Sequence, residues 1–333
     1  MVPRSLPRIY LLIGPGTLPS QGKDRLDLVR YRKSGRPRLT GQEMLAALPE
    51  IEKIARVEVD QGNPYEWATM EDLRKLAVRV NELLRLPEVG GVIYVQGTNS
   101  LEETAYFLNL TVHSTKPIVL TGAQRPFTGL STDGPVNLLD AVRVACTPET
   151  HGKGVVVVFN GEINAARDVT KTNTYHVHTF RTRDLGLLGY ADADRIAYYR
   201  APLRRHTIDS EFDVENVQHI PHVEILYIHA GAQPGLAEAA IQLGAKGLVI
   251  AGEGAGSPGN LGKEMAEIVA TRRAVVVQSS RVGEGRVVVD NNWYEPGMVV
   301  ADNLSAHKAA LLLALALIKT SNPDEIQSLF EKY

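Results

Sequence analysis

The stretch Gly90–Ala105, GGVIYVQGTNSLEETA, decides the fold that we expect for this chain. A continuous apolar run ends at Val95, and a glycine turn and a helical pattern follow, which indicates the order strand, turn, helix. Ser100 and Glu103 have the spacing of a capping box, so we expect the helix to begin there. Thr98 would then lie at the strand tip beside the first free N–H groups of the helix, which can stabilise an oxyanion.

The same order of strand and helix recurs along the chain. Further apolar runs, continuous rather than alternating, occur at Ile9–Ile13, Pro117–Thr121, Gly154–Asn160, Val223–His229, Gly247–Ala251 and Val275–Gln278. Continuous runs are typical of parallel strands buried on both faces. We therefore predict an α/β protein with a large, doubly wound, mainly parallel N-terminal sheet and a smaller C-terminal α/β domain that contains a long helix at Ala306–Lys319.

The two series of strands predict two domains, for which 333 residues are sufficient. A polar stretch flanked by prolines separates them and predicts a linker. We expect an N-terminal α/β catalytic domain at residues 1–203, a linker at 204–222 and a C-terminal α/β domain at 223–333.

The composition is that of an ordinary globular protein, with 44% hydrophobic residues and a formal net charge of -2. This charge balance gives no support to a nucleic-acid partner, and Gly35 and Pro37 within the basic stretch Arg30–Arg38 indicate a solvated loop. No apolar run approaches about 18 residues, and the N-terminus lacks a signal-peptide pattern. We expect no membrane partner and a cytoplasmic location. The single cysteine, Cys146, is expected to pack inertly in a helix.

Three loops carry residues that could do chemistry. Gly14–Ser20, GPGTLPS, lacks the third glycine of a dinucleotide loop, so it is either an ordinary turn or a strained, exposed turn that presents Thr17 as a nucleophile. Gly122–Pro126 and Asp133–Leu138 bracket a second loop. Lys171 lies among hydroxyls and amides, where it is either a solvated lysine or a partly desolvated base. No His, Cys or Asp cluster has metal-ligand spacing, and we expect no cofactor.

Together these segments resemble the bacterial-type L-asparaginases and glutaminase-asparaginases over nearly the whole chain, as a divergent member. The segments that carry the resemblance are Gly97–Thr98, Leu101–Leu108, Asp133–Pro135 with Asn137–Leu138, Arg167–Thr174, Ser279–Arg281 and Gln327–Tyr333. Several separate motifs in the right order form a specific signal, although each alone is weak.

The resemblance implies an amidohydrolase that acts on a small-molecule amide, assembled as a homodimer or homotetramer with sites between subunits. It implies that Thr17 is the nucleophile, that Tyr31 activates it, and that Thr98 works with Lys171. The positions that it places against the substrate are Gly16, Gly62, Asn63, Gly97, Asn99, Gln124, Ala255 and, from a neighbouring subunit, Asp290.

The chain departs from the family where the substrate is recognised. The usual His-Gly-Thr-Asp-Thr is Gln96–Ser100 here, so the neutral Asn99 replaces an aspartate that holds the substrate's ammonium group, which weakens that contact by about 1–3 kcal/mol. Ala255 replaces a common asparagine, and the segment Asp60–Trp67 does not align with the carboxylate-binding segment. Pro15 and Pro19 stiffen the first loop.

We therefore expect an amidohydrolase whose substrate lacks a free amino-acid head group, such as a simple amide, a lactam or an imide. Plain L-asparaginase activity and a non-catalytic homologue that binds a small molecule remain as alternatives. Without a carboxylate at position 99, the pKa of Lys171 should also fall, which would make the lysine a better base near neutral pH.

Overall fold

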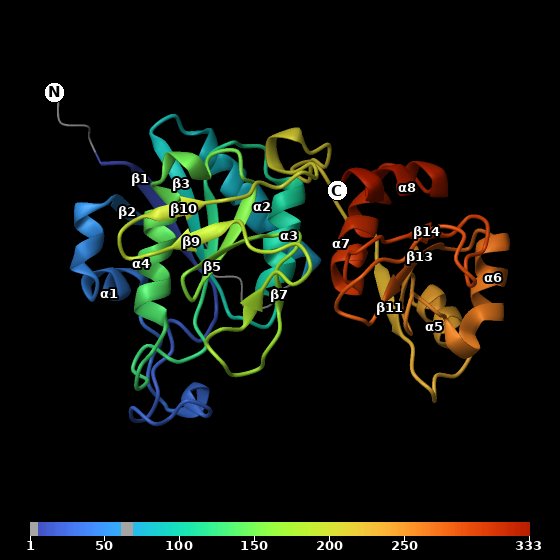
Figure 1. Cartoon of the computed structure of the whole chain (residues 1–333), viewed down its shortest axis with the longest axis horizontal. Coiled ribbons are helices and arrows are strands. Elements are labelled where there is room, and N and C mark those ends of the chain that lie inside the picture. The colour runs from blue at the N-terminus through green and yellow to red at the C-terminus, as the bar shows by residue number, and fades with distance from the viewer. Residues whose placement is uncertain (1–5, 61–68) are drawn as a thin grey trace. The chain divides into compact units, whose positions relative to one another are not determined.

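The computed structural model describes residues 6–60 and 69–333, which divide into two compact units, one ending at Glu215 and the other beginning at Asn216 (Figure 1). Gly62 and Asn63, which the sequence places against the substrate, lie outside the described residues. Each unit has its own sheet, and each is described here by itself.

The N-terminal unit is built on an eight-stranded sheet in the order β10-β9-β6-β5-β4-β3-β1-β2. The strands from β5 to β2 pair in parallel, whereas β6, β9 and β10 add an antiparallel edge. The strands are β1 Arg8–Ile13, β2 Arg56–Val59, β3 Val89–Val95, β4 Ile118–Thr121, β5 Val155–Phe159, β6 Glu162–Ala165, β9 Gly189–Ala191 and β10 Ile196–Tyr198; a separate ladder pairs β7 Thr170–Lys171 with β8 Phe180–Arg181.

Helices cover both faces of this sheet. In Figure 1, α1 and α4 lie on one face and α2 and α3 on the other. Their bounds are α1 Gly41–Ala46, α2 Met70–Arg85, α3 Leu101–Thr111 and α4 Gly134–Ala145, with 3₁₀ turns at η1 Tyr31–Lys33, η2 Pro49–Lys53, η3 Pro148–Thr150 and η4 Thr207–Asp209. The strands β3, β4 and β5 are buried on both faces, which explains their continuous apolar runs.

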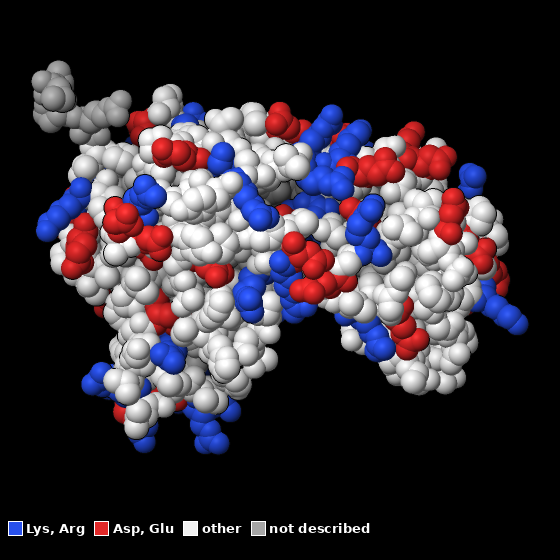
Figure 2. All heavy atoms as spheres, in the orientation of Figure 1, with Lys and Arg blue, Asp and Glu red and all other residues white. Residues whose placement is uncertain are grey.

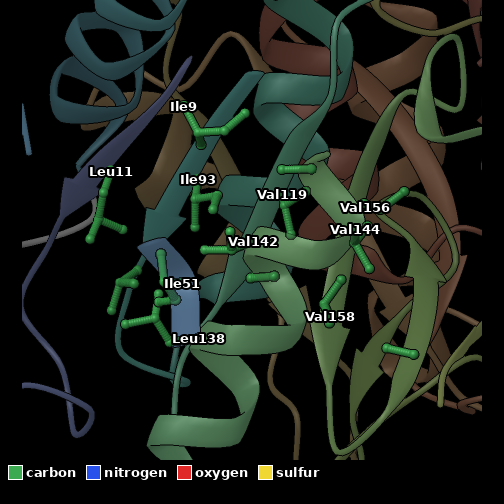
Figure 3. Packing of buried hydrophobic residues seen from close by; sticks show 14 of the residues in the cluster. Ile9, Leu11, Ile51, Ile93, Val119, Leu138, Val142, Val144, Val156 and Val158 are labelled. Carbon is green, nitrogen blue, oxygen red and sulfur yellow. The ribbon is translucent and has the colours of Figure 1, made fainter. Parts of the chain in front are cut away.

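The core between the sheet and α4 is made of branched aliphatic side chains (Figure 3). Ile93, Val119 and Val156 project from neighbouring strands toward Leu138 and Val142 of α4. These side chains have no exposed surface, and each contributes about 1.5–3 kcal/mol by its burial. This packing fixes the positions of the strands and hence of the loops that follow them.

The C-terminal unit is a parallel four-stranded sheet in the order β11-β12-β13-β14. Its elements are β11 Val223–Tyr227, α5 Leu236–Gln242, β12 Gly247–Gly252, η5 Gly259–Leu261, α6 Gly262–Ala270, β13 Val275–Ser280, β14 Val299–Val300, α7 Ala306–Ala316 and α8 Pro323–Lys332. Leu248 and Ile250 pack with Ala237 of α5 and Met265 of α6. A Cβ on Gly247 would lie 2.6 Å from Leu313, so α7 packs closely on the sheet there.

The predicted α/β class and its division into a large N-terminal sheet and a smaller C-terminal sheet are confirmed. The predicted capping box is wrong, however. Ser100 precedes α3 as expected, but its backbone (φ -125°, ψ 15°) is not extended and its side chain does not cap the helix. Instead Ser100 Oγ accepts a hydrogen bond from Gln96 Nε2 at 3.2 Å.

Among the described residues, no helix combines the length and the apolar character needed to cross a membrane. On the face drawn in Figure 2, acidic and basic side chains both occur on each unit.

Two glycines, Gly16 and Gly122, allow the strand ends of the N-terminal unit to approach one another. The strand β3 lies between β1 and β4, so the loops that follow these three strands are neighbours. A Cβ on Gly122, directly after β4, would lie 2.4 Å from the carbonyl oxygen of Gln96, and one on Gly16 would lie 2.6 Å from the nitrogen of Gly97. No side chain fits at such distances, so glycine is required by packing rather than by turn geometry.

Gly122→Ala should therefore lower the free energy of unfolding by about 1–3 kcal/mol, because the loops after β3 and β4 must move apart. Gly90→Ala is the matched control, since a Cβ there would meet its neighbours at an ordinary 3.4 Å, and it should change stability by less than about 0.5 kcal/mol. Urea unfolding followed by circular dichroism measures both. Equal effects of the two substitutions would contradict the packing account.

Candidate active site

The first candidate loop, Gly14–Ser20, is buried rather than exposed. Thr17 is 5% exposed, Leu18 is fully buried in the core beside α4, and no residue of the loop has a positive φ. The strained, exposed turn considered from the sequence is therefore wrong. The loop is held by hydrogen bonds instead, from Gly14 N–H to Val95 O at 2.8 Å and from Ser20 Oγ to Gly16 O at 2.7 Å.

The loops after β1 and β3 are joined backbone to backbone. Gly97 N–H donates to Pro15 O at 2.7 Å, and Gly16 packs directly against Gly97. This contact makes Thr17 and Thr98 the next residues on two touching loops. Because Gly97 N–H is occupied by this hydrogen bond, it cannot also bind an oxyanion. Within the described residues, the N–H groups of Thr17 and Thr98 make no hydrogen bond.

Thr17 is paired with the tyrosine that the sequence predicts. Its Oγ1 lies 2.8 Å from Tyr31 Oη, and either hydroxyl can be the donor. Tyr31 is the first residue of the 3₁₀ turn η1. No residue of this turn is fully buried, and Tyr31 itself is half-buried. The chain between Thr17 and Tyr31 thus folds back and brings the phenol of Tyr31 against the hydroxyl of Thr17.

Thr98 is paired with the lysine that the sequence predicts. Lys171 Nζ donates to Thr98 Oγ1 at 2.7 Å, and Thr98 Oγ1 donates to Gln124 Oε1 at 3.1 Å. Gln124 Nε2 in turn donates to His176 O at 3.2 Å, so the amide links the threonine to the loop after β7. Thr98 is 5% exposed. Five of the predicted residues therefore form two hydrogen-bonded groups, Thr17 with Tyr31 and Thr98 with Lys171 and Gln124.

The pKa of Lys171 is lowered from its ordinary value, chiefly by burial, while the charge of Glu102 acts in the opposite direction. Burial is a cause of this lowering that the sequence did not indicate. Asn99 is exposed. The effect of its missing charge on the pKa of the lysine stays a prediction.

Asp133 organises the loop that carries Gln124. Its carboxylate accepts hydrogen bonds from Gln124 N–H and Arg125 N–H, both at 2.9 Å, and from Asn137 Nδ2 at 3.2 Å. Asp133 is 7% exposed and caps no N–H of α4 with its side chain. Both oxygens of a buried carboxylate are thus used to shape the loop after β4.

Two predicted substrate residues belong to the C-terminal unit. Ala255 is exposed in the turn after β12. Asp290 is exposed and has a left-handed backbone, with φ 59°.

Cys146 follows α4 in a half-buried position, and burial raises the pKa of its thiol to about 11, which makes it unreactive.

The sequence did not indicate the roles of Asp133 and Glu102, although both lie in the motifs that it singled out. Glu102 is 7% exposed, and its Oε1 accepts the backbone N–H of Lys171 at 3.0 Å. A carboxylate on the first turn of a helix usually faces solvent or the helix N-terminus. The position of both residues inside motifs shared with the family could have indicated these roles. An acidic residue in such a motif is a candidate partner for an N–H group that is distant in the sequence.

Comparison with known proteins identifies relatives over the whole chain. Residues 8–204 match the family model described as asparaginase, N-terminal, and residues 222–330 match the glutaminase/asparaginase C-terminal domain. The chain is 40% identical to L-asparaginase 2 of Bacillus subtilis, covering 99% of this chain and 88% of the relative, and 38% identical to the glutaminase-asparaginase of Acinetobacter glutaminasificans, covering 98% and 99%. The crystal structure of a probable cytoplasmic L-asparaginase from Campylobacter jejuni superposes with a TM-score of 0.92 at 36% identity, covering 98% of this chain and 100% of that one.

Asp133→Asn should lower the free energy of unfolding by about 2–3 kcal/mol, because the amide keeps one acceptor and turns an NH₂ group toward a backbone N–H. The matched control is Asp194→Asn, whose side chain is 76% exposed and whose loss should cost less than about 0.5 kcal/mol. Urea unfolding measures both variants. If Asp133→Asn is as stable as the control, the carboxylate does not organise the loop.

Proposed function

The chain belongs to the asparaginase and glutaminase-asparaginase family of amidohydrolases, and on this premise we propose that it hydrolyses small amides through an acyl-enzyme on Thr17. The observation that carries the proposal is the pair of hydroxyl contacts on two touching loops. Thr17 Oγ1 lies 2.8 Å from Tyr31 Oη, and Thr98 Oγ1 lies 2.7 Å from Lys171 Nζ. Each nucleophilic oxygen thus has a proton-transfer partner at hydrogen-bond distance.

In the first step, Thr17 Oγ1 attacks the amide carbonyl as its proton leaves through Tyr31. The carbon–nitrogen bond breaks, the leaving nitrogen takes up a proton, and ammonia or an amine departs from an acyl-threonine ester. Thr98 N–H, which has no partner among the described residues, is positioned by the loop contact to stabilise the oxyanion.

In the second step, water cleaves the ester and restores Thr17. Thr98 and Lys171 bind and activate this water, because the partly buried lysine has a lowered pKa and can be a neutral base. The sum of the two steps is one amide and one water converted to one carboxylic acid and one amine. The hydroxyl, phenol and amine groups used in these two steps all belong to the N-terminal unit.

For the substrate we propose an amide without a free amino-acid head group, such as a simple amide, a lactam or an imide. Asn99 beside Thr98 is neutral, and Ala255 has no polar side chain. Neither can attract an ammonium or carboxylate group by charge, so binding energy for an α-amino acid is reduced. An uncharged amide loses nothing by these two changes.

Plain L-asparaginase activity is the second candidate, and a specific observation favours it. Relatives that align over 98–99% of this chain are named L-asparaginase or glutaminase-asparaginase. The two hydroxyl contacts serve asparagine as well as any other amide. Substrate recognition, rather than the chemistry, separates the two candidates.

We also propose that the working enzyme is a homodimer or homotetramer, with Asp290 of one subunit completing the site of another. Asp290 is exposed, and Val288, Val289 and Trp293 in the same segment are each at least 40% exposed. Exposed apolar side chains around an acidic residue are typical of a surface that another subunit covers.

A cytoplasmic location is part of the proposal, and it is in keeping with the name of the Campylobacter jejuni relative.

Thr17→Ala should abolish ammonia release from every substrate, because no other hydroxyl can replace the attacking oxygen. A panel of L-asparagine, L-glutamine, simple amides, lactams and imides should show turnover of uncharged amides at higher kcat/KM than of asparagine. Thr271→Ala, at the end of α6, is the control for the substitution and should keep full activity. Asparagine as the preferred substrate would favour the second candidate, and full activity of Thr17→Ala would contradict the mechanism.

Asn99→Asp should raise kcat/KM for L-asparagine relative to an uncharged amide by about 10-fold or more, which corresponds to about 1.4 kcal/mol of recovered binding to the ammonium group. The measurement is the ratio of the two kcat/KM values in the variant and in the unchanged chain. Asn99→Ala controls for side-chain loss and should not raise the ratio. If the ratio of kcat/KM values is unchanged in Asn99→Asp, the side chain at position 99 does not contribute to binding of the substrate's ammonium group.

A further inference from the structure

We infer that Glu102 is a positioning residue for Lys171: it anchors the backbone of the lysine and supplies the negative charge beside its amine. The inference rests on the proposed function for its catalytic meaning. Its structural content stands on two contacts within the N-terminal unit, and it explains why a buried carboxylate occurs on the first turn of α3.

The first contact holds the backbone of Lys171. Glu102 is 7% exposed, and a buried carboxylate is stable only when hydrogen bonds replace the water that it loses. Its Oε1 accepts the N–H of Lys171 at 3.0 Å, across 69 residues of sequence. The two-residue strand β7 pairs with β8 on its other side, where Lys171 lies opposite Phe180. The lysine backbone is therefore held between a strand and a helix.

The second contact holds the amine of the same lysine. Nζ donates to Thr98 Oγ1 at 2.7 Å, and Thr98 lies four residues before Glu102. The start of α3 and its preceding turn thus bind Lys171 at both ends, by the backbone and by the amine. A lysine side chain has several rotatable bonds. Fixing both of its ends removes most of the conformational freedom that would otherwise move Nζ away from Thr98.

The surrounding elements carry other titratable groups. Arg181 of β8 lies opposite Thr170, Arg167 and Asp168 pair with each other at 3.1 Å, and His178 pairs with Glu162 at 2.9 Å. Among the described residues, Glu102 is the group whose charge raises the pKa of Lys171, against the larger lowering by burial. The carboxylate therefore opposes the desolvation that would otherwise favour the neutral amine.

This arrangement assigns to Glu102 a task that position 99 cannot perform. Asn99 is neutral and exposed, whereas Glu102 is charged and buried against the lysine backbone. Charge acts more strongly where water is excluded. Removing the charge of Glu102 should therefore change Lys171 more than adding a charge at position 99.

The test is a pH titration of Lys171 in the full-length protein, observed by NMR with ¹⁵N-labelled lysine and assigned by loss of the signal in Lys171→Met. Glu102→Gln keeps an oxygen that can accept the backbone N–H but removes the charge. The pKa of Lys171 should fall further, and the low-pH limb of kcat/KM should move by about one pH unit to lower pH. Glu103→Gln, on the same turn, is the matched control and should move neither. Asn99→Asp should produce a smaller shift than Glu102→Gln.

A pKa of Lys171 that stays within about 0.2 unit in a folded Glu102→Gln variant would overturn the inference, even if activity falls, because a merely structural role predicts lost activity without a shifted limb. If that variant does not fold, the reciprocal titration decides. Interacting groups shift one another's titration, so Lys171→Met should raise the pKa of the Glu102 carboxyl group, observed by ¹³C NMR, and no rise would overturn the inference. Both titrations are independent of activity, so their outcome stands even if no amide in the panel is hydrolysed.

Discussion

The site depends on one close backbone contact, between Gly16 after β1 and Gly97 after β3. Gly97 N–H donates to Pro15 O at 2.7 Å, and a Cβ on Gly16 would lie 2.6 Å from Gly97 N, so neither loop can move without the other. The contact is possible because β1 and β3 are paired in parallel and end together, with Ile13 opposite Val95. Thr17 and Thr98 follow the two glycines directly. The sheet thus brings two positions that are remote in the sequence onto two touching loops.

Much of this arrangement could be predicted from the sequence, and the failures have physical reasons. Continuous apolar runs predicted the buried strands, and motif order indicated the family. The resemblance to that family then implied the partners Thr17–Tyr31 and Thr98–Lys171. The capping box failed because the backbone of Ser100 is not extended, and its hydroxyl accepts a hydrogen bond from Gln96 four residues earlier. The N–H of Gly97 is taken by the carbonyl of Pro15, on a loop that is remote in the sequence. A local pattern determines neither the choice of side-chain partner within a turn nor a contact between remote loops.

Buried carboxylates hold the chain segments around the two hydroxyl contacts in place. Asp133 folds the loop that carries Gln124, and Glu102 anchors the strand that carries Lys171. Asn99 and Ala255, which we propose contact the substrate, are exposed instead. Change at exposed positions alters binding with little effect on stability, whereas loss of a buried carboxylate removes several hydrogen bonds at once. The proposed substrate contacts therefore lie at exposed positions, separate from the buried carboxylates that hold the loops.

The most direct test of the central claim is to trap the acyl-enzyme. The protein is mixed with an amide that it turns over, quenched in acid within one turnover, digested and mapped by mass spectrometry. The account predicts a mass increase equal to the acyl group on the peptide that contains Thr17, and its absence in Thr17→Ala. An acyl group on Thr98 instead, or turnover with no acylated threonine under these conditions, would contradict it.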